Sequence, residues 1–145
     1  IPDDDETSIV HGDYRLDNMI LNNNKVMGIL DWELSTLGHP IADFSYHCLS
    51  WRTQEAFWDQ SKLKELGIPN EREYMDMYCE NTGKDLSKNW EFYMAFNMFK
   101  IAGILQGILG RVRDGTASSK HAEDRGMMVY PLSEAAWNTI KENLL

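Results

Sequence analysis

The fold is decided by two short segments, HGDYRLDN at residues 11–18 and DWE at residues 31–33. A short β-prone run, SIV, precedes the first segment, and Gly12 ends that strand in a loop. Between the two segments, apolar runs at residues 18–21 and 25–30 flank three consecutive asparagines, which form turns readily. This pattern predicts a β-hairpin between the loop and DWE.

Three polar side chains stand around the predicted hairpin. Asp13 lies on the loop before it, Asn18 at its entry, and Asp31 immediately after it. Because a hairpin brings its two ends together, we expect Asn18 and Asp31 to be neighbours, with Asp13 on the adjoining loop. Mg²⁺ prefers oxygen donors and takes its remaining ligands from water and phosphate. The set therefore predicts Asn18 and Asp31 as Mg²⁺ ligands, with Asp13 able to accept a proton from a hydroxyl beside bound phosphate.

Length and composition predict a single globular domain. The chain has 145 residues, of which 43% are hydrophobic and 26% charged, and it is too short for two ordinary domains. Its net charge of -9 argues against nucleic acid or an anionic membrane as a partner, because both require clustered Lys and Arg. No segment approaches the roughly 20 continuous apolar residues of a membrane span.

The two cysteines, Cys48 and Cys79, are each in an apolar-rich stretch. We expect buried, reduced thiols rather than a disulfide or a metal site. This expectation favours an intracellular protein, cytoplasmic first, with the mitochondrial or peroxisomal matrix as alternatives.

Beyond DWE the sequence is mainly helical. A loop that contains Gly38 leads into a buried helix predicted over residues 41–51. Asn70 and Glu73 have the spacing of a capping box, which predicts the start of another helix. Gly83 is positioned to end that helix.

The longest helix is predicted to start near residues 87–89 and to end at Arg113. Its apolar residues cover too much of the circumference for a surface helix, so we expect it to be the central core helix. Three glycines on one of its faces are interpreted as positions of close helix packing. They are Gly103, Gly107 and Gly110.

The polar residues 113–126 predict a loop. A last amphipathic helix is predicted after Pro131, with four apolar residues at helical spacing on its buried face. These residues are Leu132, Ala136, Ile140 and Leu144.

The ordered set of His11-Gly12-Asp13, Asn18, the hairpin and Asp31 resembles the catalytic core of the aminoglycoside phosphotransferase and choline kinase family. That family shares its architecture with protein kinases. The resemblance implies an α+β fold, a protein-kinase-like C-terminal lobe that is mostly helical with a small β-hairpin next to the catalytic loop. A lone His-Gly-Asp would be weak evidence, whereas the ordered set is specific.

The resemblance implies cofactors and a role for several side chains. ATP and Mg²⁺ are the implied cofactors, and Asp13 is the implied catalytic base. Asn18 and Asp31 are the implied ligands of Mg²⁺ and, through it, of ATP. Asp43 matches an acid of the family that accepts hydrogen bonds from the backbone of the catalytic loop, so we expect a structural role for it.

His11 and Arg15 complete the expected catalytic set with Asp13. His11 is expected to support the loop through hydrogen bonds. Arg15 invites a phosphate-binding role because a guanidinium pairs with phosphate. A salt bridge from Arg15 to a neighbouring acid is the alternative, and the sequence leaves both open.

Two longer strings look like one branch of the family, the kinase domains fused to or neighbouring acyl-CoA dehydrogenases. They are HGDYRLDNMI and GILDWELSTLGHPIADFSYH. In that branch the implied substrate is a hydroxyacyl-CoA, phosphorylated on its hydroxyl. A fused or neighbouring acyl-CoA dehydrogenase is therefore an expected partner. The oligomeric state is open, and a homodimer is one option.

The expected function is ATP-dependent transfer of the γ-phosphate to a hydroxyl of a small molecule. The alternative is a catalytically silent kinase-like domain that binds and regulates a partner or an acyl-CoA. The glycine-rich strand-turn-strand, strand Lys and helix Glu of the family have no place in this sequence. We therefore expect residues 1–145 to be a C-terminal lobe without the N-terminal ATP-binding lobe, and the isolated fragment to be inactive.

Overall fold

The computed structural model describes residues 2–3, 6–53 and 60–144. The chain divides into two compact units, Ile1–Trp90 and Glu91–Leu145. The strands of the described chain all belong to the first unit, and the second unit is helical. The α+β class, mostly helical with a small β-hairpin, is confirmed. The single domain over residues 1–145 stays a prediction.

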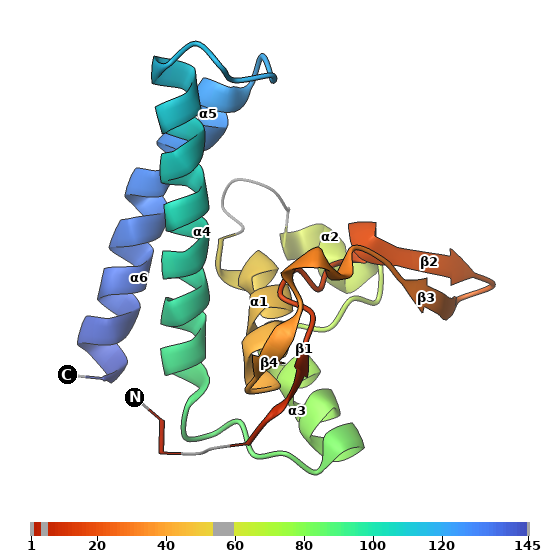
Figure 1. Cartoon of the computed structure of the whole chain (residues 1–145). Coiled ribbons are helices and arrows are strands. Elements are labelled where there is room, and N and C mark those ends of the chain that lie inside the picture. Colours follow the sequence, from red (N-terminus) through yellow and green to blue (C-terminus); the bar gives the residue numbers. More distant parts are fainter. Residues whose placement is uncertain (1, 4–5, 54–59, 145) are drawn as a thin grey trace. The chain divides into compact units, whose positions relative to one another are not determined.

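The predicted hairpin is present in the first unit. It consists of β2 (Met19–Asn22) and β3 (Lys25–Ile29), paired antiparallel (Figure 1). Its turn is shorter than the run of asparagines suggested, because Asn22 pairs with Lys25. Asn23 and Asn24 form the turn with φ of 48° and 59°, the left-handed conformation that two-residue hairpin turns require and that Asn tolerates.

A second antiparallel pair joins β1 (Ser8–Val10) to β4 (Thr36–Gly38). The strand at Ser8–Val10 was predicted, whereas the stretch around Gly38 was predicted as a loop, and that prediction is wrong. A strand of three residues contains too little alternation to be recognised without its partner. The pairing places Gly38 opposite Ser8 at the start of the sequence that leads into the 11–18 loop.

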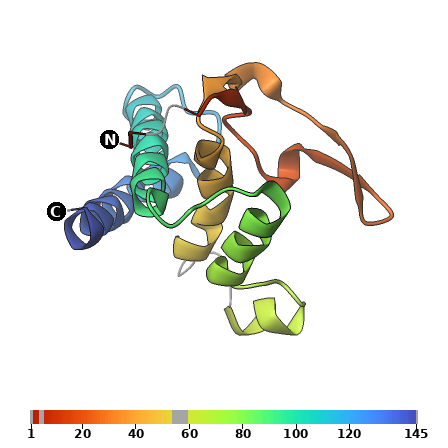
Figure 2. The ribbon, with the colours of Figure 1, turned by 90° about the horizontal axis from the view of Figure 1, so that it is seen from below.

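Helices α1 (Ile41–Arg52), α2 (Gln60–Glu65) and α3 (Glu71–Thr82) complete the first unit. Figure 2 shows the β2–β3 hairpin extending away from α1 and α3. The capping box is confirmed, since Asn70 Oδ1 accepts the Glu73 N–H and the Glu73 carboxylate accepts the Asn70 N–H, each at 2.9 Å. Gly83 ends α3 with φ of 72°.

Aromatic packing and one ion pair tie α1 to α3. Phe44 of α1 stacks on Tyr78 of α3 with ring centroids 3.9 Å apart. The Arg52 guanidinium lies 2.8 Å from the Glu71 carboxylate, which also accepts a hydrogen bond from Trp90 Nε1 at 2.9 Å. These contacts fix the register of α1, the helix that faces the 11–18 loop with Asp43.

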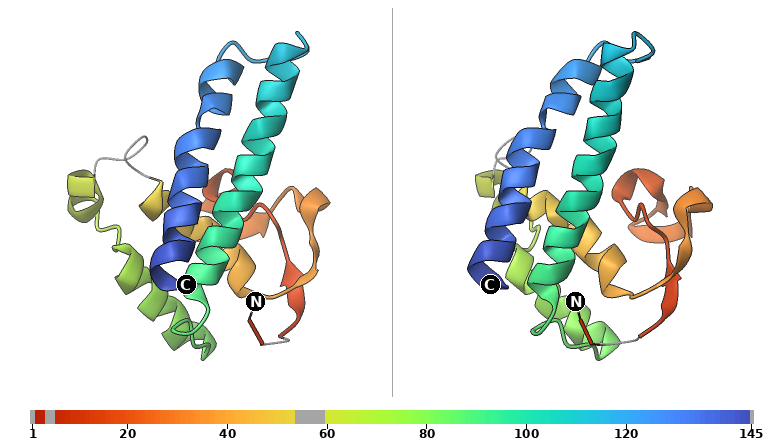
Figure 3. Two further views of the ribbon diagram at one scale, coloured as in Figure 1. Left: turned by 90° about the vertical axis from the view of Figure 1, so that its left-hand side faces the viewer. Right: turned by 60° about the vertical axis from the view of Figure 1, so that its left-hand side comes forward.

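The second unit contains α4 (Trp90–Arg113, which starts at the last residue of the first unit), α5 (Ala122–Met127) and α6 (Val129–Asn143). Figure 3 shows α4 and α6 side by side with opposite directions, and α5 at one end. The predicted loop over residues 113–126 is wrong from Ala122 onward, because a single polar helix of six residues has no visible periodicity. Pro131 lies inside the first turn of α6, where its missing N–H would have no helical partner.

The prediction of α4 as the central core helix is wrong for part of its apolar surface. Met94 and Met98 are buried, but Phe96, Phe99 and Ile104 are 48%, 75% and 50% exposed. By length and composition, α4 is also a helix that could cross a membrane, with a mean hydropathy of 1.3 in an 18-residue window. Core helices of soluble proteins meet the same criteria, so this is weak evidence, although the sequence suggested no such segment.

The free thiols agree with expectation, with Cys48 buried and Cys79 partly buried. The predicted close packing of helices at the glycines of α4 is wrong. A Cβ built on Gly103 or Gly110 would meet nothing within 4 Å, and on Gly107 only an arginine side chain. The close approach in the second unit is made by Gly126 of α5, whose added Cβ would lie 2.5 Å from Leu109 Cδ2 of α4.

Replacing Gly126 by alanine is expected to lower the free energy of unfolding by about 1–3 kcal/mol, because the new methyl group would overlap Leu109. Urea unfolding of the full-length protein measures this change. Gly103→Ala is the matched control, since it sits in open space within α4 and should be neutral or stabilising by up to about 1 kcal/mol. Equal effects of the two substitutions would contradict this packing of α5 on α4.

Candidate active site

The 11–18 loop begins with a turn that only glycine accommodates. Gly12 has φ of 85°, in the left-handed region that favours glycine. A Cβ at this position would also lie 2.7 Å from the carbonyl oxygen of Leu34. Gly12 is therefore required both by its backbone conformation and by the close approach of the chain that follows the hairpin.

The backbone of this loop is held by one carboxylate from α1. Asp43 Oδ2 accepts the His11 N–H, and Asp43 Oδ1 accepts the Gly12 N–H at 2.8 Å. Hydrogen bonds to an ionised acceptor are stronger than neutral ones. Asp43 thus has the geometry that its expected structural role requires.

His11 connects the loop to the end of the hairpin. Its ring is buried, and Nδ1 accepts the Asp13 N–H at 3.2 Å. Nε2 therefore carries the proton and donates to the Leu30 carbonyl oxygen at 2.8 Å. With both ring nitrogens engaged, His11 is arranged to support the loop rather than to act as a base.

The Asp13 carboxylate receives donors on both oxygens. Asn18 Nδ2 donates to Oδ2 at 3.0 Å, and the Tyr46 hydroxyl donates to Oδ1 at 2.7 Å. Asn18 Nδ2 also bonds the Asp13 carbonyl oxygen at 2.9 Å. The Asp13 side chain remains 23% exposed, so an incoming hydroxyl can still reach it.

Backbone pairing brings Asn18 and Asp31 to the same end of the hairpin. Asn18 ends the short 3-10 helix η1 (Leu16–Asn18), and its carbonyl oxygen accepts the Leu30 N–H at 2.8 Å. Asp31 follows directly, with φ of 63° and ψ of 57°, before the 3-10 helix η2 (Trp32–Leu34). Among the residues that the structure describes, no hydrogen bond joins the Asp31 carboxylate to Asn18 or Asp13, so Asp31 is related to Asn18 through the backbone pairing of its neighbour Leu30.

The oxygen atoms of Asn18 and Asp31 fit a Mg²⁺ site in which phosphate and water supply the remaining ligands. Within the described residues, no group of three or more His, Cys, Asp or Glu side chains could hold a metal by itself. Asn18 uses its amide nitrogen toward Asp13, which leaves Oδ1 as an oxygen ligand. The Asp31 carboxylate is exposed. One carboxylate and one amide oxygen suit Mg²⁺, which normally takes few protein ligands.

Arg15 forms ion pairs with the neighbouring acids. Its Nε lies 3.6 Å from Asp13 Oδ2, and its guanidinium lies 3.4 Å from the Asp17 carboxylate. The side chain is 54% exposed. The salt-bridge alternative describes this structure, and a phosphate-binding role for Arg15 stays a prediction.

Tyr46 was missed by sequence reasoning. It lies on α1 three residues after Asp43, so the two side chains share one face of the helix. The sequence signal is the three-residue spacing from Asp43, which becomes informative once the register of α1 against the loop is known. A tyrosine in a helical stretch nevertheless suggests core packing first.

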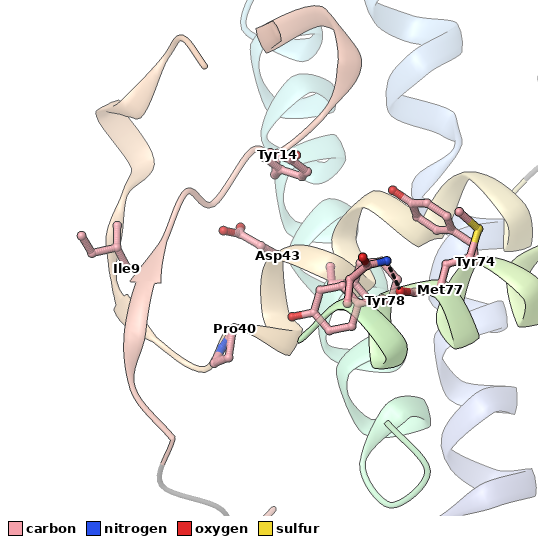
Figure 4. Close-up of a pocket in the computed structure, with 9 residues that line it drawn as sticks. Ile9, Tyr14, Pro40, Asp43, Tyr74, Met77 and Tyr78 are labelled. Carbon is pink, nitrogen blue, oxygen red and sulfur yellow. Dashed lines mark hydrogen bonds between the residues drawn. The ribbon is translucent and has the colours of Figure 1, made fainter. Parts of the chain in front are cut away.

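A pocket of about 410 Å³ adjoins this site (Figure 4). Tyr14 of the loop and Asp43 of α1 line one part of it, and side chains of α3 line another. The remaining lining is mainly aromatic and apolar. The full set is Ile9, Tyr14, Pro40, Asp43, Phe44, Tyr74, Met77, Tyr78 and Asn81.

Comparison with known proteins gives the family. Residues 1–78, which contain the loop, the hairpin, α1 and most of α3, match the Phosphotransferase enzyme family. The chain belongs to this family. A crystal structure of a Ralstonia eutropha JMP134 protein, classed as an aminoglycoside phosphotransferase, superimposes on this chain with a TM-score of 0.85 and 49% identity. The match covers 98% of this chain and 45% of that one.

Two curated relatives are named as members of the acyl-CoA dehydrogenase family. This chain is 43% identical over 145 residues to acyl-CoA dehydrogenase family member 10 of Mus musculus. It is 38% identical over 141 residues to acyl-CoA dehydrogenase family member 11 of Homo sapiens. The matches cover 95% and 92% of this chain but only 14% and 18% of those proteins. The chain thus spans less than a fifth of these relatives.

Replacing Asp43 by asparagine is expected to lower the free energy of unfolding by about 2 kcal/mol, because the charge-assisted bonds to His11 and Gly12 are weakened and one acceptor is lost. Urea unfolding of the full-length protein provides the measurement. The control is Asp76→Asn, which removes only an exposed pair with Arg72 and should cost less than about 0.5 kcal/mol. An Asp43→Asn protein as stable as this control would show that Asp43 does not hold the loop.

Proposed function

We propose that this phosphotransferase catalyses Mg²⁺-dependent transfer of the γ-phosphate of ATP to a hydroxyl of a small molecule. The observation that supports the proposal most directly is the Asp13 carboxylate, which accepts a hydrogen bond on each oxygen and stays 23% exposed. It lies next to the end of the hairpin to which Asn18 and Asp31 both belong. A base next to oxygen ligands for a divalent ion is what phosphoryl transfer requires.

The proposed step assigns one task to each group. The acceptor hydroxyl gives its proton to the Asp13 carboxylate while its oxygen forms a bond to the γ-phosphorus. The bond from that phosphorus to the β,γ-bridging oxygen breaks, and ADP leaves with the electron pair. Asn18 and Asp31 would hold Mg²⁺, which neutralises charge on the phosphates when bound.

A hydroxyacyl-CoA is the acceptor class that we propose first. The argument comes from the relatives, which are named as acyl-CoA dehydrogenase family members, so a kinase acting on an acyl-CoA hydroxyl would share their type of substrate. The same relatives support a fused or neighbouring acyl-CoA dehydrogenase as the partner. A panel of hydroxyacyl-CoA esters, aminoglycosides, choline-like amines and sugars, each with ATP and Mg²⁺, would identify the acceptor.

Asp13→Asn in the full-length protein is expected to lower kcat by about 10²- to 10⁴-fold, because the amide cannot accept the hydroxyl proton. ADP formation with the best acceptor of the panel measures the rate, and equilibrium binding of ATP should stay close to wild type. Asp17→Asn is the matched control, since Asp17 is 78% exposed and pairs only with the exposed Arg15 in the part of the chain described. Unchanged turnover in Asp13→Asn would rule out the proposed base.

A further inference from the structure

The Tyr46 hydroxyl reaches the carboxylate that the proposed function treats as the base. It donates to Asp13 Oδ1 at 2.7 Å from 33 residues away in sequence. Tyr46 and Asp43 lie one turn apart on α1, so the helix that holds the loop backbone also brings the phenol to the end of the Asp13 side chain. The placement of this hydroxyl is therefore as rigid as the contact between α1 and the loop.

The second oxygen of Asp13 has a donor from another element. Asn18 Nδ2 donates to Oδ2 at 3.0 Å, and Arg15 Nε lies 3.6 Å from the same oxygen. The terminal torsion of an Asp side chain is intrinsically broad. Each carboxylate oxygen of Asp13 accepts a hydrogen bond from a different element, α1 for Oδ1 and η1 for Oδ2. The two hydrogen bonds together restrict the terminal torsion of Asp13.

The two hydrogen bonds leave the carboxylate able to react. An ionised carboxylate has about four lone-pair positions, so each oxygen keeps one after accepting a hydrogen bond. Burial, the hydrogen bond to Asp13 and the negative charge of Asp13 all raise the pKa of Tyr46 well above its ordinary value. The phenol consequently stays protonated and remains a donor to Asp13 rather than a competing base.

We propose that Tyr46 is a positioning residue for phosphoryl transfer, whose hydroxyl orients the Asp13 carboxylate toward the acceptor hydroxyl. This inference rests on the proposed function. Helix α1 would then have two functions: Asp43 binds the backbone of the loop, and Tyr46 orients the catalytic carboxylate. Tyr46 itself contacts neither the acceptor nor ATP in this scheme and acts through Asp13 alone.

The test replaces the Tyr46 hydroxyl without changing the ring. Tyr46→Phe in the full-length protein should lower kcat by about 10- to 100-fold, since a small misorientation of a catalytic group has an effect of this size. KM for ATP should stay unchanged, because nothing that binds the nucleotide is altered. Rates are measured as ADP formation from Mg²⁺ and ATP with the best acceptor of the panel. Tyr130→Phe is the matched control, since Tyr130 is 64% exposed and should show wild-type kcat.

A double variant separates positioning from a merely structural role. If Tyr46 acts only through Asp13, adding Tyr46→Phe to Asp13→Asn should leave the residual rate nearly unchanged. A structural role would instead lower the rate by the same factor in both backgrounds and would lower the melting temperature in both.

The outcomes distinguish the two proposals. Wild-type kcat in Tyr46→Phe, or an equal loss in both backgrounds, overturns the positioning role even when Asp13→Asn lowers kcat as the proposed function expects. Wild-type turnover in Asp13→Asn, or a wild-type protein inactive across the whole panel, overturns the proposed function and with it the inference.

Discussion

Two hydrogen bonds from consecutive backbone N–H groups to the Asp43 carboxylate fix the 11–18 loop, and the rest of the candidate site depends on them. They align the loop with the first turn of α1, where Asp43 is placed by the helix that starts at Ile41. The β1–β4 pairing before the loop and the hydrogen bond from the His11 ring to Leu30 hold the loop as well. The left-handed conformation of Gly12 and the buried ring of His11 follow from that alignment.

Further hydrogen bonds join the 11–18 loop to the end of the hairpin and to α1, and they restrict the movement of these elements relative to one another. His11 links the loop to Leu30, and Leu30 links back to Asn18, so the loop and the hairpin end move together. Asp13 accepts one hydrogen bond from Asn18 and one from Tyr46, each on a different carboxylate oxygen. Preorganised groups of this kind need no rearrangement when charge develops, which is the main source of catalysis in phosphoryl transfer.

The catalytic and metal-binding roles of Asp13, Asn18 and Asp31 stay predictions, whereas the structure tests the surroundings in which these residues lie. The three residues could be selected as candidates because oxygen side chains at the ends of a hairpin need no knowledge of distant packing. Tyr46 could not, since its role depends on the register of α1 against the loop. The strand β4 and helix α5 were missed because three to six residues show no periodicity. The exposure of Phe99 was missed because apolar character alone does not identify the neighbours of a side chain.

The central claim is that Asn18 and Asp31 converge on one divalent ion while Asp13 stays free to accept a proton. A crystal structure of the full-length protein with Mn²⁺ and a non-hydrolysable ATP analogue tests it directly, because the anomalous signal of Mn²⁺ locates the ion. The account predicts an ion bound by Asn18 Oδ1, the Asp31 carboxylate and phosphate oxygens, with Asp13 outside its coordination shell. An ion bound elsewhere, or Asn18 and Asp31 in separate environments, would contradict it.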